Sequence, residues 1–205
     1  IIFIDNPIDK VSSIIKEQLS FDSGKILIDE EDVTDKTVSV RASMGLAYLP
    51  QEPSVFGRLT VEENILAALE QRRDINKEQK KRELEKLVEE FQLKKFLKTK
   101  SIKLSGGERR RVEIARSLSS NPSFILLDEP FAGIDPKAVS ELKETLKKLK
   151  NLKLGILISD HNVRETMQIC DNVLIMNEGK VIAEGTPEKV SANDLVKEIY
   201  LGQDF

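Results

Sequence analysis

The sequence has a single cysteine, Cys170, a single histidine, His161, and no tryptophan. One cysteine excludes an internal disulfide and a metal site built from several cysteines, and it fits a reducing compartment. No apolar run approaches the roughly 18–20 residues that a helix needs to span a bilayer. We therefore expect any membrane role to come through a partner chain.

An excess of basic residues is also absent. The 32 lysines and arginines against 35 aspartates and glutamates give a net charge of −3, which provides no overall basic surface for nucleic acid. Hydrophobic residues make up 40% and charged residues 33% of the chain, a balance that favours a soluble globular protein over a disordered one. The length of 205 residues allows one large or two small domains.

Short apolar runs alternate with amphipathic segments, and this alternation predicts a parallel α/β sheet. Helices are predicted at about 142–149 and 163–170, and the last two strands flank an Asn-Glu-Gly turn that is typical of a hairpin. The predicted strands span residues 26–28, 45–49, 124–127, 154–158, 173–176 and 180–183.

Between about residues 60 and 115 the chain is rich in charge and predicted to be mostly helical. Its apolar residues Leu84, Leu87, Val88 and Phe91 are spaced i, i+3, i+4 and i+7, which places them on one face of an amphipathic helix. The charged residues around them are expected to form a solvated face.

Asp128 and Glu129 directly follow the apolar run at 124–127. Ligands of open α/β sheets bind outside the carboxyl ends of the strands, so Asp128 is placed to hold a cation such as Mg²⁺ that bridges phosphates. Glu129 is placed to orient or deprotonate a water that attacks a γ-phosphate. A surface acidic pair that opens a turn before Pro130 explains this segment equally well when it is taken alone.

Ser105, Gly106 and Gly107 precede a predicted helix at 108–118. Two glycines let the backbone approach a ligand closely, and a helix N-terminus presents N–H groups and a positive dipole end to an anion. By itself, the segment is better explained as a glycine loop that caps a helix.

Three other polar residues stand at the ends of predicted elements. His161 follows the strand at 154–158, at the same edge of the sheet as Asp128, although a lone histidine is more often structural. Gln51 follows the strand at 45–49, and Asp135 lies in a Gly-Ile-Asp-Pro sequence that is typical of a turn.

Taken together and in this order, these segments resemble the motifs of the ATPase domain of ABC transporters. Gln51 matches the Q-loop glutamine, and Leu-Ser-Gly-Gly-Glu at 104–108 matches the family's signature sequence. Residues 124–129 match the Walker B strand with its catalytic glutamate, residues 132–135 match the D-loop, and His161 matches the H-loop histidine.

Within this family, the chain is most similar to the ATPase subunits of bacterial lipopolysaccharide exporters, and the ATPases of branched-chain amino acid importers are related to them. The similarity covers about residues 20–205. It includes Asp-His-Asn-Val-Arg-Glu-Thr at 160–166 and the ending Tyr-Leu-Gly-Gln-Asp-Phe at 200–205.

The resemblance implies an α/β fold, a P-loop NTPase-like ABC ATPase domain with a helical subdomain and an incomplete N-terminal part. It implies a single domain over residues 1–205. Within this domain, a helical signalling subdomain spans about 60–115, and a RecA-like core with a C-terminal region spans 20–59 and 116–205.

The resemblance also implies a homodimer that traps ATP and Mg²⁺ between its subunits, on the cytoplasmic face of the bacterial inner membrane. Asp128 and Gln51 would serve the Mg²⁺, Glu129 the attacking water, and His161 the γ-phosphate. Transmembrane permease subunits would dock on the segment from Pro53 to Leu59. Closure of the dimer on ATP would then drive these subunits. The nucleotide-contacting residues would be Gln51, Ser105, Gly106, Gly107, Glu108, Asp135 and, as a weak match, Lys10.

The sequence departs from the family at the phosphate loop. A Walker A loop has the pattern G-x-x-x-x-G-K-[ST], whose N–H groups and lysine surround the phosphates, and none of the ten glycines fits this pattern. The loop is expected near residues 2–11, where Asn6 and Lys10 can be aligned but Pro7 and Asp9 stand in place of the glycines. Pro7 removes an N–H donor.

Three explanations for this departure stay open. Residues 1–19 derive from a shifted frame or a truncation, which the missing Met and the return of the family pattern at about residue 20 favour. Alternatively, the chain has lost its own nucleotide site and only donates Ser105 and Gly107 to a partner, or it binds nucleotide through Lys10. A soluble ABC ATPase that acts on nucleic acid or ribosomes fits less well, because the chain has neither tandem domains nor a basic linker.

Overall fold

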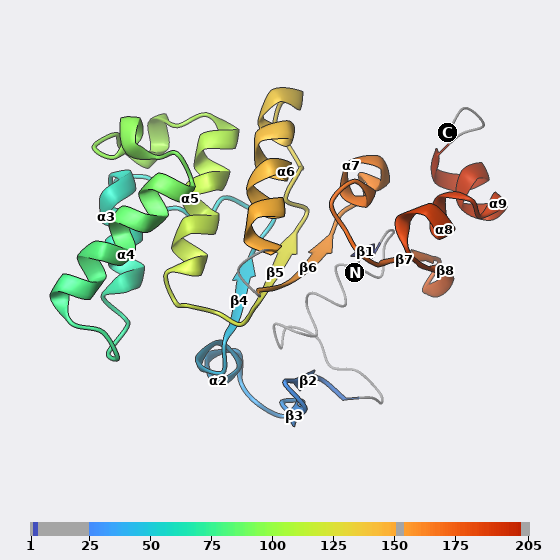
Figure 1. Ribbon diagram of the computed structural model, residues 1–205, viewed down its shortest axis with the longest axis horizontal. Coiled ribbons are helices and arrows are strands. Elements are labelled where there is room, and N and C mark those ends of the chain that lie inside the picture. The colour runs from blue at the N-terminus through green and yellow to red at the C-terminus, as the bar shows by residue number, and fades with distance from the viewer. Residues whose placement is uncertain (1, 4–24, 151–153, 202–205) are drawn as a thin grey trace. The chain divides into compact units, whose positions relative to one another are not determined.

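The computed structural model describes residues 2–3, 25–150 and 154–201 (Figure 1). The chain divides into two compact units. The first unit comprises Ile1–Leu46, Leu126–Pro130 and Ile156–Phe205, and the second comprises Ala47–Ile125 and Phe131–Gly155. No helix within the described residues is long and apolar enough to cross a membrane.

A four-stranded sheet has the strand order β1-β6-β5-β4. β1 runs parallel to β6, with Ile2 opposite Ile158 and Phe3 opposite Ser159, in agreement with the parallel pairing that the alternating pattern predicts. β5 and β6 each extend one residue beyond the apolar runs, to Asp128 and Ser159, so two polar side chains end these strands. The strands of this sheet are β1 (Ile2–Phe3), β4 (Leu46–Leu49), β5 (Phe124–Asp128) and β6 (Gly155–Ser159).

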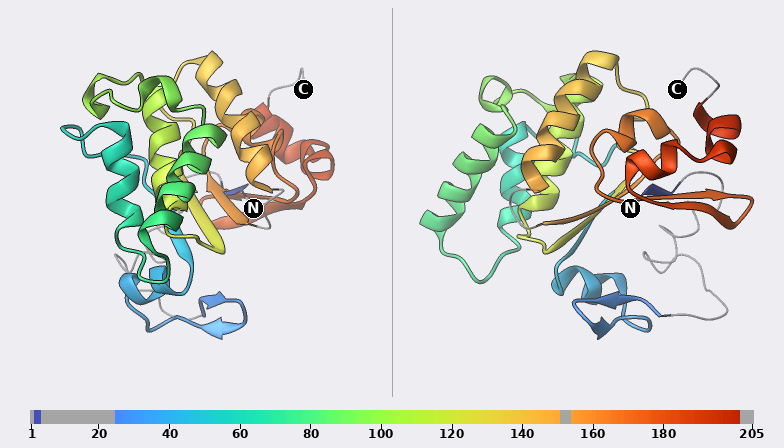
Figure 2. Two further views of the ribbon diagram at one scale, coloured as in Figure 1. Left: turned by 60° about the vertical axis from the view of Figure 1, so that its left-hand side comes forward. Right: turned by 45° about the vertical axis from the view of Figure 1, so that its right-hand side comes forward.

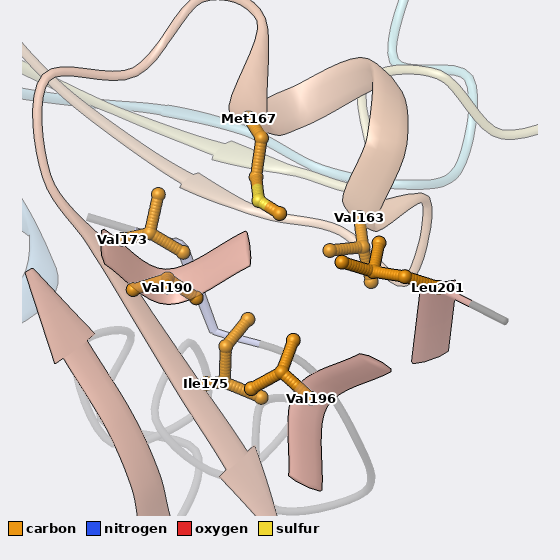
Figure 3. Close-up of a cluster of buried hydrophobic side chains, with 7 residues drawn as sticks. All are labelled: Val163, Met167, Val173, Ile175, Val190, Val196 and Leu201. Atoms are coloured by element: carbon orange, nitrogen blue, oxygen red, sulfur yellow. The ribbon is translucent and has the colours of Figure 1, made fainter. Parts of the chain in front are cut away.

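In the first unit, the predicted hairpin is present as β7 (Val173–Asn177) and β8 (Lys180–Gly185), which are antiparallel. Short helices pack against it and enclose an apolar cluster (Figure 3). The cluster consists of Val163, Met167, Val173, Ile175, Val190, Val196 and Leu201. The other elements of this unit are β2 (Leu27–Ile28), β3 (Glu31–Asp32), α2 (Val38–Ser43), α7 (Val163–Met167), α8 (Pro187–Ser191), α9 (Asp194–Val196) and the π-helix η3 (Lys197–Leu201).

The helix predicted at 163–170 ends earlier than expected, at Met167. The N–H of Ile169 donates to the carbonyl of Thr166 at 3.1 Å, a three-residue spacing that tightens the last turn and stops the α-helix. Met167 and Ile169 are both buried, which explains why the apolar pattern in the sequence continues beyond the end of the helix.

The second unit is dominated by helices, in which α3 contacts α4 and α5, and α5 contacts α6 (Figures 1 and 2). Its helices are α3 (Val61–Leu69), α4 (Lys77–Glu90), η1 (Lys94–Phe96), η2 (Ser101–Lys103), α5 (Gly106–Leu118) and α6 (Pro136–Lys150). The amphipathic face predicted around Leu84 is the buried face of α4. The single-domain organisation and its subdomain boundaries stay a prediction.

Capping boxes begin three of these helices: Thr60 with Glu63 for α3, Asn76 with Gln79 for α4, and Ser105 with Glu108 for α5. In each box, the first side chain accepts from a backbone N–H three residues on, and the later side chain accepts from the backbone of the first residue. The helix starts are therefore fixed by local sequence.

Candidate functional site

Asp128 stands at the carboxyl end of β5 and is 7% exposed. The hydroxyl of Ser159, the last residue of β6, donates to Oδ1 of Asp128 at 2.7 Å. Ser159 is itself buried. A polar pair of this kind is stable inside the protein because the buried carboxylate accepts a hydrogen bond.

Glu129 leaves the strand with a left-handed backbone, at φ +42°. This region is sparsely populated by residues other than glycine, and it persists where the surroundings hold the backbone in place. The N–H of Glu129 donates to the carbonyl of Ser159 at 2.7 Å. Ser159 thus contacts both acids, one through its hydroxyl and the other through its main chain.

His161 lies beside Glu129, with Nδ1 at 3.4 Å from Oε2 of the glutamate. The imidazole is 68% exposed, whereas the side chain of Asp160 before it is fully buried. Oδ1 of Asp160 accepts from the N–H of Asn162 at 2.8 Å, which fixes the turn that carries the histidine. The structure therefore brings Asp128, Glu129 and His161 together, as expected from the strand ends.

Ser105 is the N-cap of α5. Its hydroxyl accepts from the N–H of Glu108 at 3.3 Å, and Oε2 of Glu108 accepts from the N–H of Ser105 at 2.9 Å. A capping role for this segment is one of the two interpretations that the sequence left open. The helix of 13 residues also directs its first N–H groups outward from this end, so capping and anion binding are compatible.

Gly107 has a packing role that the sequence did not predict. A Cβ atom at this position would lie 2.5 Å from Cβ of Ala138 in α6, and one at Gly106 would lie 3.4 Å from the side chain of Ile134. Gly107 therefore allows α5 to approach α6 closely, whereas a side chain at Gly106 would make an ordinary contact. This packing requirement is separate from any need for a ligand to approach the backbone closely.

Asp135 is the residue before α6, and its Oδ1 accepts from the N–H groups of Lys137 and Ala138 at 3.1 and 3.0 Å. It lines a polar cavity of about 550 Å³ together with Ser105, Gly107 and Glu108. The signature sequence and the D-loop aspartate, 30 residues apart in the chain, thus face the same space.

Gln51 lies two residues after the end of β4, is exposed and belongs to the second unit. The segment after it is held by residues that belong to none of the sequence motifs. The amide of Asn64, which is fully buried, accepts from the N–H of Phe56 at 2.8 Å and donates to the carbonyl of Phe56 at 3.1 Å. The carboxylate of Glu113 accepts from the N–H of Ser54 at 2.6 Å.

Arg116 completes this support. Its Nη2 donates to the hydroxyl of Ser54 at 2.8 Å, and its guanidinium lies 5.1 Å from the ring centroid of Phe56. Burial lowers the pKa of Arg116, and the carboxylate of Glu113 partly offsets this effect. No pattern in the sequence distinguishes Glu113 and Arg116 from the solvated charges around them, because their partners lie about 60 residues away.

The phosphate loop is expected near residues 2–11; residues 2–3 form β1, and Lys10 with the remainder of the expected loop lies outside the described residues. Among the described residues, no three acidic, histidine or cysteine side chains gather into a metal site. Mg²⁺ commonly keeps several waters and takes one or two carboxylates plus substrate phosphates. The buried carboxylate of Asp128 at a strand end fits this requirement.

Comparison with known proteins identifies the family. Residues 11–132 match the model of the ABC transporter family, and residues 180–205 match that of the branched-chain amino acid ATP-binding cassette transporter. The first match spans more than half of the chain. This chain therefore belongs to the ATP-binding cassette family of ABC transporters, which confirms the predicted fold class and makes nucleotide the ligand class of the family.

Individual relatives agree with this assignment. The chain is 52% identical over 184 residues to the lipopolysaccharide export system ATP-binding protein LptB of Haemophilus influenzae, and 47% identical to the protein of that name in Escherichia coli. Each alignment covers 90% of this chain and 76% of the relative. A solved ATP-binding cassette of an ABC transporter, in its ADP conformation, superposes with a TM-score of 0.82 at 28% identity, over 98% of this chain and 87% of that one.

Proposed function

We propose that this chain is the ATP-binding and ATP-hydrolysing subunit of a transporter that exports lipopolysaccharide. The observation that carries the hydrolytic part is the contact between His161 and Glu129 beside the buried Asp128. The identity of 47–52% with proteins named for lipopolysaccharide export supports the choice of transporter.

The three residues suit different tasks in phosphoryl transfer. Asp128 supplies a hard oxygen ligand for Mg²⁺, which neutralises phosphate charge when it is bound. Glu129, with a side chain that is 21% exposed, holds the attacking water within reach of its carboxylate. The exposed imidazole of His161 is free to contact a γ-phosphate while its Nδ1 faces Glu129. Gln51 is the second proposed Mg²⁺ ligand.

The remaining site residues serve a second subunit in this proposal. Two copies form a homodimer, and Ser105, Gly106, Gly107 and Glu108 at the start of α5 face the nucleotide of the partner. Asp135, in the same cavity, contributes from the start of α6. Lys10 remains the weak candidate for the chain's own phosphate site.

Transmembrane permease subunits dock near the segment from Pro53 to Leu59, at the cytoplasmic face of the inner membrane. Support comes from the rigid attachment of this segment by Asn64 and Glu113, and from the 55% exposure of the Phe56 side chain on it. A firmly held loop with an exposed aromatic residue can transmit a displacement to a partner, whereas a loose loop would absorb it.

The direct test is ATP binding and turnover by the purified chain and its Glu129→Gln variant. The amide still binds nucleotide but cannot accept a proton from water, so turnover should fall at least about 100-fold while ATP affinity is retained. Glu144→Gln, at an exposed site on α6, is the matched control and should turn over normally. Unchanged turnover in Glu129→Gln would contradict the role of this residue, and absence of ATP binding in the parent chain would favour the catalytically incompetent alternative.

The match of residues 180–205 to the branched-chain amino acid transporter family supports an importer as the second candidate. The two are separated by complementation. Export predicts that the chain rescues growth of bacteria depleted of their lipopolysaccharide export ATPase. Restoration of branched-chain amino acid uptake, without that rescue, would favour the importer.

A further inference from the structure

Ser159 holds both acids of the site from the end of the neighbouring strand. Its hydroxyl donates to Oδ1 of Asp128 at 2.7 Å, and its carbonyl accepts from the N–H of Glu129 at 2.7 Å. The three residues belong to the same unit of the chain. Ser159 is 2% exposed and Asp128 is 7% exposed, so water competes little for this hydrogen bond.

This contact constrains the direction of the Asp128 carboxylate. A hydrogen bond to one oxygen restricts rotation of the planar carboxylate and thereby sets where its other oxygen points. Groups that hydrogen-bond a metal-ligating carboxylate fix its orientation, and their loss typically lowers metal affinity 10–100-fold. A backbone carbonyl at position 159 is available from any residue, whereas the donor to Asp128 comes from the side-chain hydroxyl of Ser159.

We propose that Ser159 is a positioning residue, whose hydroxyl orients Asp128 toward Mg²⁺ while its main chain holds Glu129 at the water. This inference rests on the proposed function, because it takes Asp128 as the metal ligand. The end of β6 then has a role in metal binding, in addition to leading the chain to His161.

The test measures binding of Mn²⁺, as a paramagnetic substitute for Mg²⁺, by electron paramagnetic resonance, with and without ATP. We expect Ser159→Ala to raise the Mn²⁺ dissociation constant about tenfold. Ser159→Thr keeps a hydroxyl on the Cβ atom, and we expect this variant to retain most of the Mn²⁺ affinity of the parent chain. Where turnover is measurable, the Mg²⁺ concentration that gives half the maximal rate should rise in Ser159→Ala in the same proportion.

Ser119→Ala is the matched control. Ser119 is also 2% exposed, and its hydroxyl donates to the carbonyl of Ala115 in α5, so its loss removes an equally buried hydroxyl that is bonded to a backbone carbonyl and not to Asp128. Mn²⁺ affinity should be unchanged in this variant. Thermal melting of all variants, measured in parallel, separates a loss of folding from a loss of metal affinity.

Equal Mn²⁺ affinity in Ser159→Ala and the parent chain would overturn the proposal, as would a parent chain that binds no Mn²⁺, or an equal loss of affinity in the alanine and threonine variants. The proposed function fails on a different result, the absence of ATP binding or turnover in a parent chain that still binds Mn²⁺. The two failures are therefore distinguishable.

Discussion

Single residues in this chain serve purposes that their types alone do not show. The signature glycines illustrate this, because Gly107 permits the close contact of α5 with α6 at Ala138. The family pattern identifies the glycine, and the structure supplies a packing reason for it that is independent of any ligand.

We therefore predict that Gly107→Ala lowers the free energy of unfolding by about 1–3 kcal/mol, since its Cβ would lie 2.5 Å from Cβ of Ala138 and the backbone of one helix must shift. Urea denaturation followed by circular dichroism measures the change. Adding Ala138→Gly should recover part of the loss.

Gly57→Ala is the control for this prediction. A Cβ at Gly57 meets Cβ of Ile102 at 3.6 Å, an ordinary contact, so the stability should change by less than about 1 kcal/mol. An equal loss in both variants would show that contact with α6 is not the cause.

At the scale of elements, the segment after Gln51 takes its shape from helices that lie later in the chain. The side-chain amide of Asn64 in α3 forms hydrogen bonds with the main chain of Phe56 through both its oxygen and its nitrogen. Its Nδ2 also donates to the hydroxyl of Ser101 at 2.9 Å. One buried side chain thus joins the proposed docking segment to α3 and η2.

Asn64→Ala should remove this connection and lower the free energy of unfolding by about 1–3 kcal/mol, because buried partners lose their hydrogen bonds. Hydrogen–deuterium exchange at the N–H of Phe56 should become faster. Asn76→Ala, which removes only the N-cap of α4, should cost about 1 kcal/mol and leave exchange at Phe56 as it is; faster exchange there in both variants would argue against a specific role for Asn64.

The capping box of α3 gives a pH prediction. The backbone N–H and then the hydroxyl of Thr60 donate to the carboxylate of Glu63 and lower its pKa below the ordinary value of 4.5. A carboxyl whose pKa is lowered by folding contributes stability above pH 4.5, and this contribution is lost as the pH falls through the folded-state pKa.

Glu63→Gln should therefore lose less stability than the parent chain when urea denaturation is repeated at decreasing pH below about 4.5. Glu89→Gln, at an exposed position on α4, should keep the parent's acid dependence. If the free energy of unfolding fell identically at low pH in the parent chain and in Glu63→Gln, the capping box would be excluded as a source of the pH dependence.

At the scale of the whole molecule, the proposed homodimer predicts assembly that depends on nucleotide. Glu129→Gln with ATP and Mg²⁺ should sediment as a dimer, because trapped nucleotide joins the two interfaces and is not removed by hydrolysis. The nucleotide-free and ADP-bound protein should sediment as a monomer in the same analytical ultracentrifugation experiment. A single sedimentation coefficient under all three conditions would contradict the assembly.

The sequence by itself determined the family, the strands at 124–127 and 154–158 and the hairpin, because motif order and apolar runs are properties of neighbouring residues. It placed two helix starts too late, at 108 and about 142, where α5 begins at Gly106 and α6 at Pro136. It also placed Asp128, Glu129 and His161 at one edge of the sheet. Only the tertiary structure decided that Ser159 contacts Asp128 across 31 residues, that Gly107 packs on Ala138, and that Glu113 holds Ser54. These contacts join residues with no local pattern in common, so they exist only once the strands and helices have packed.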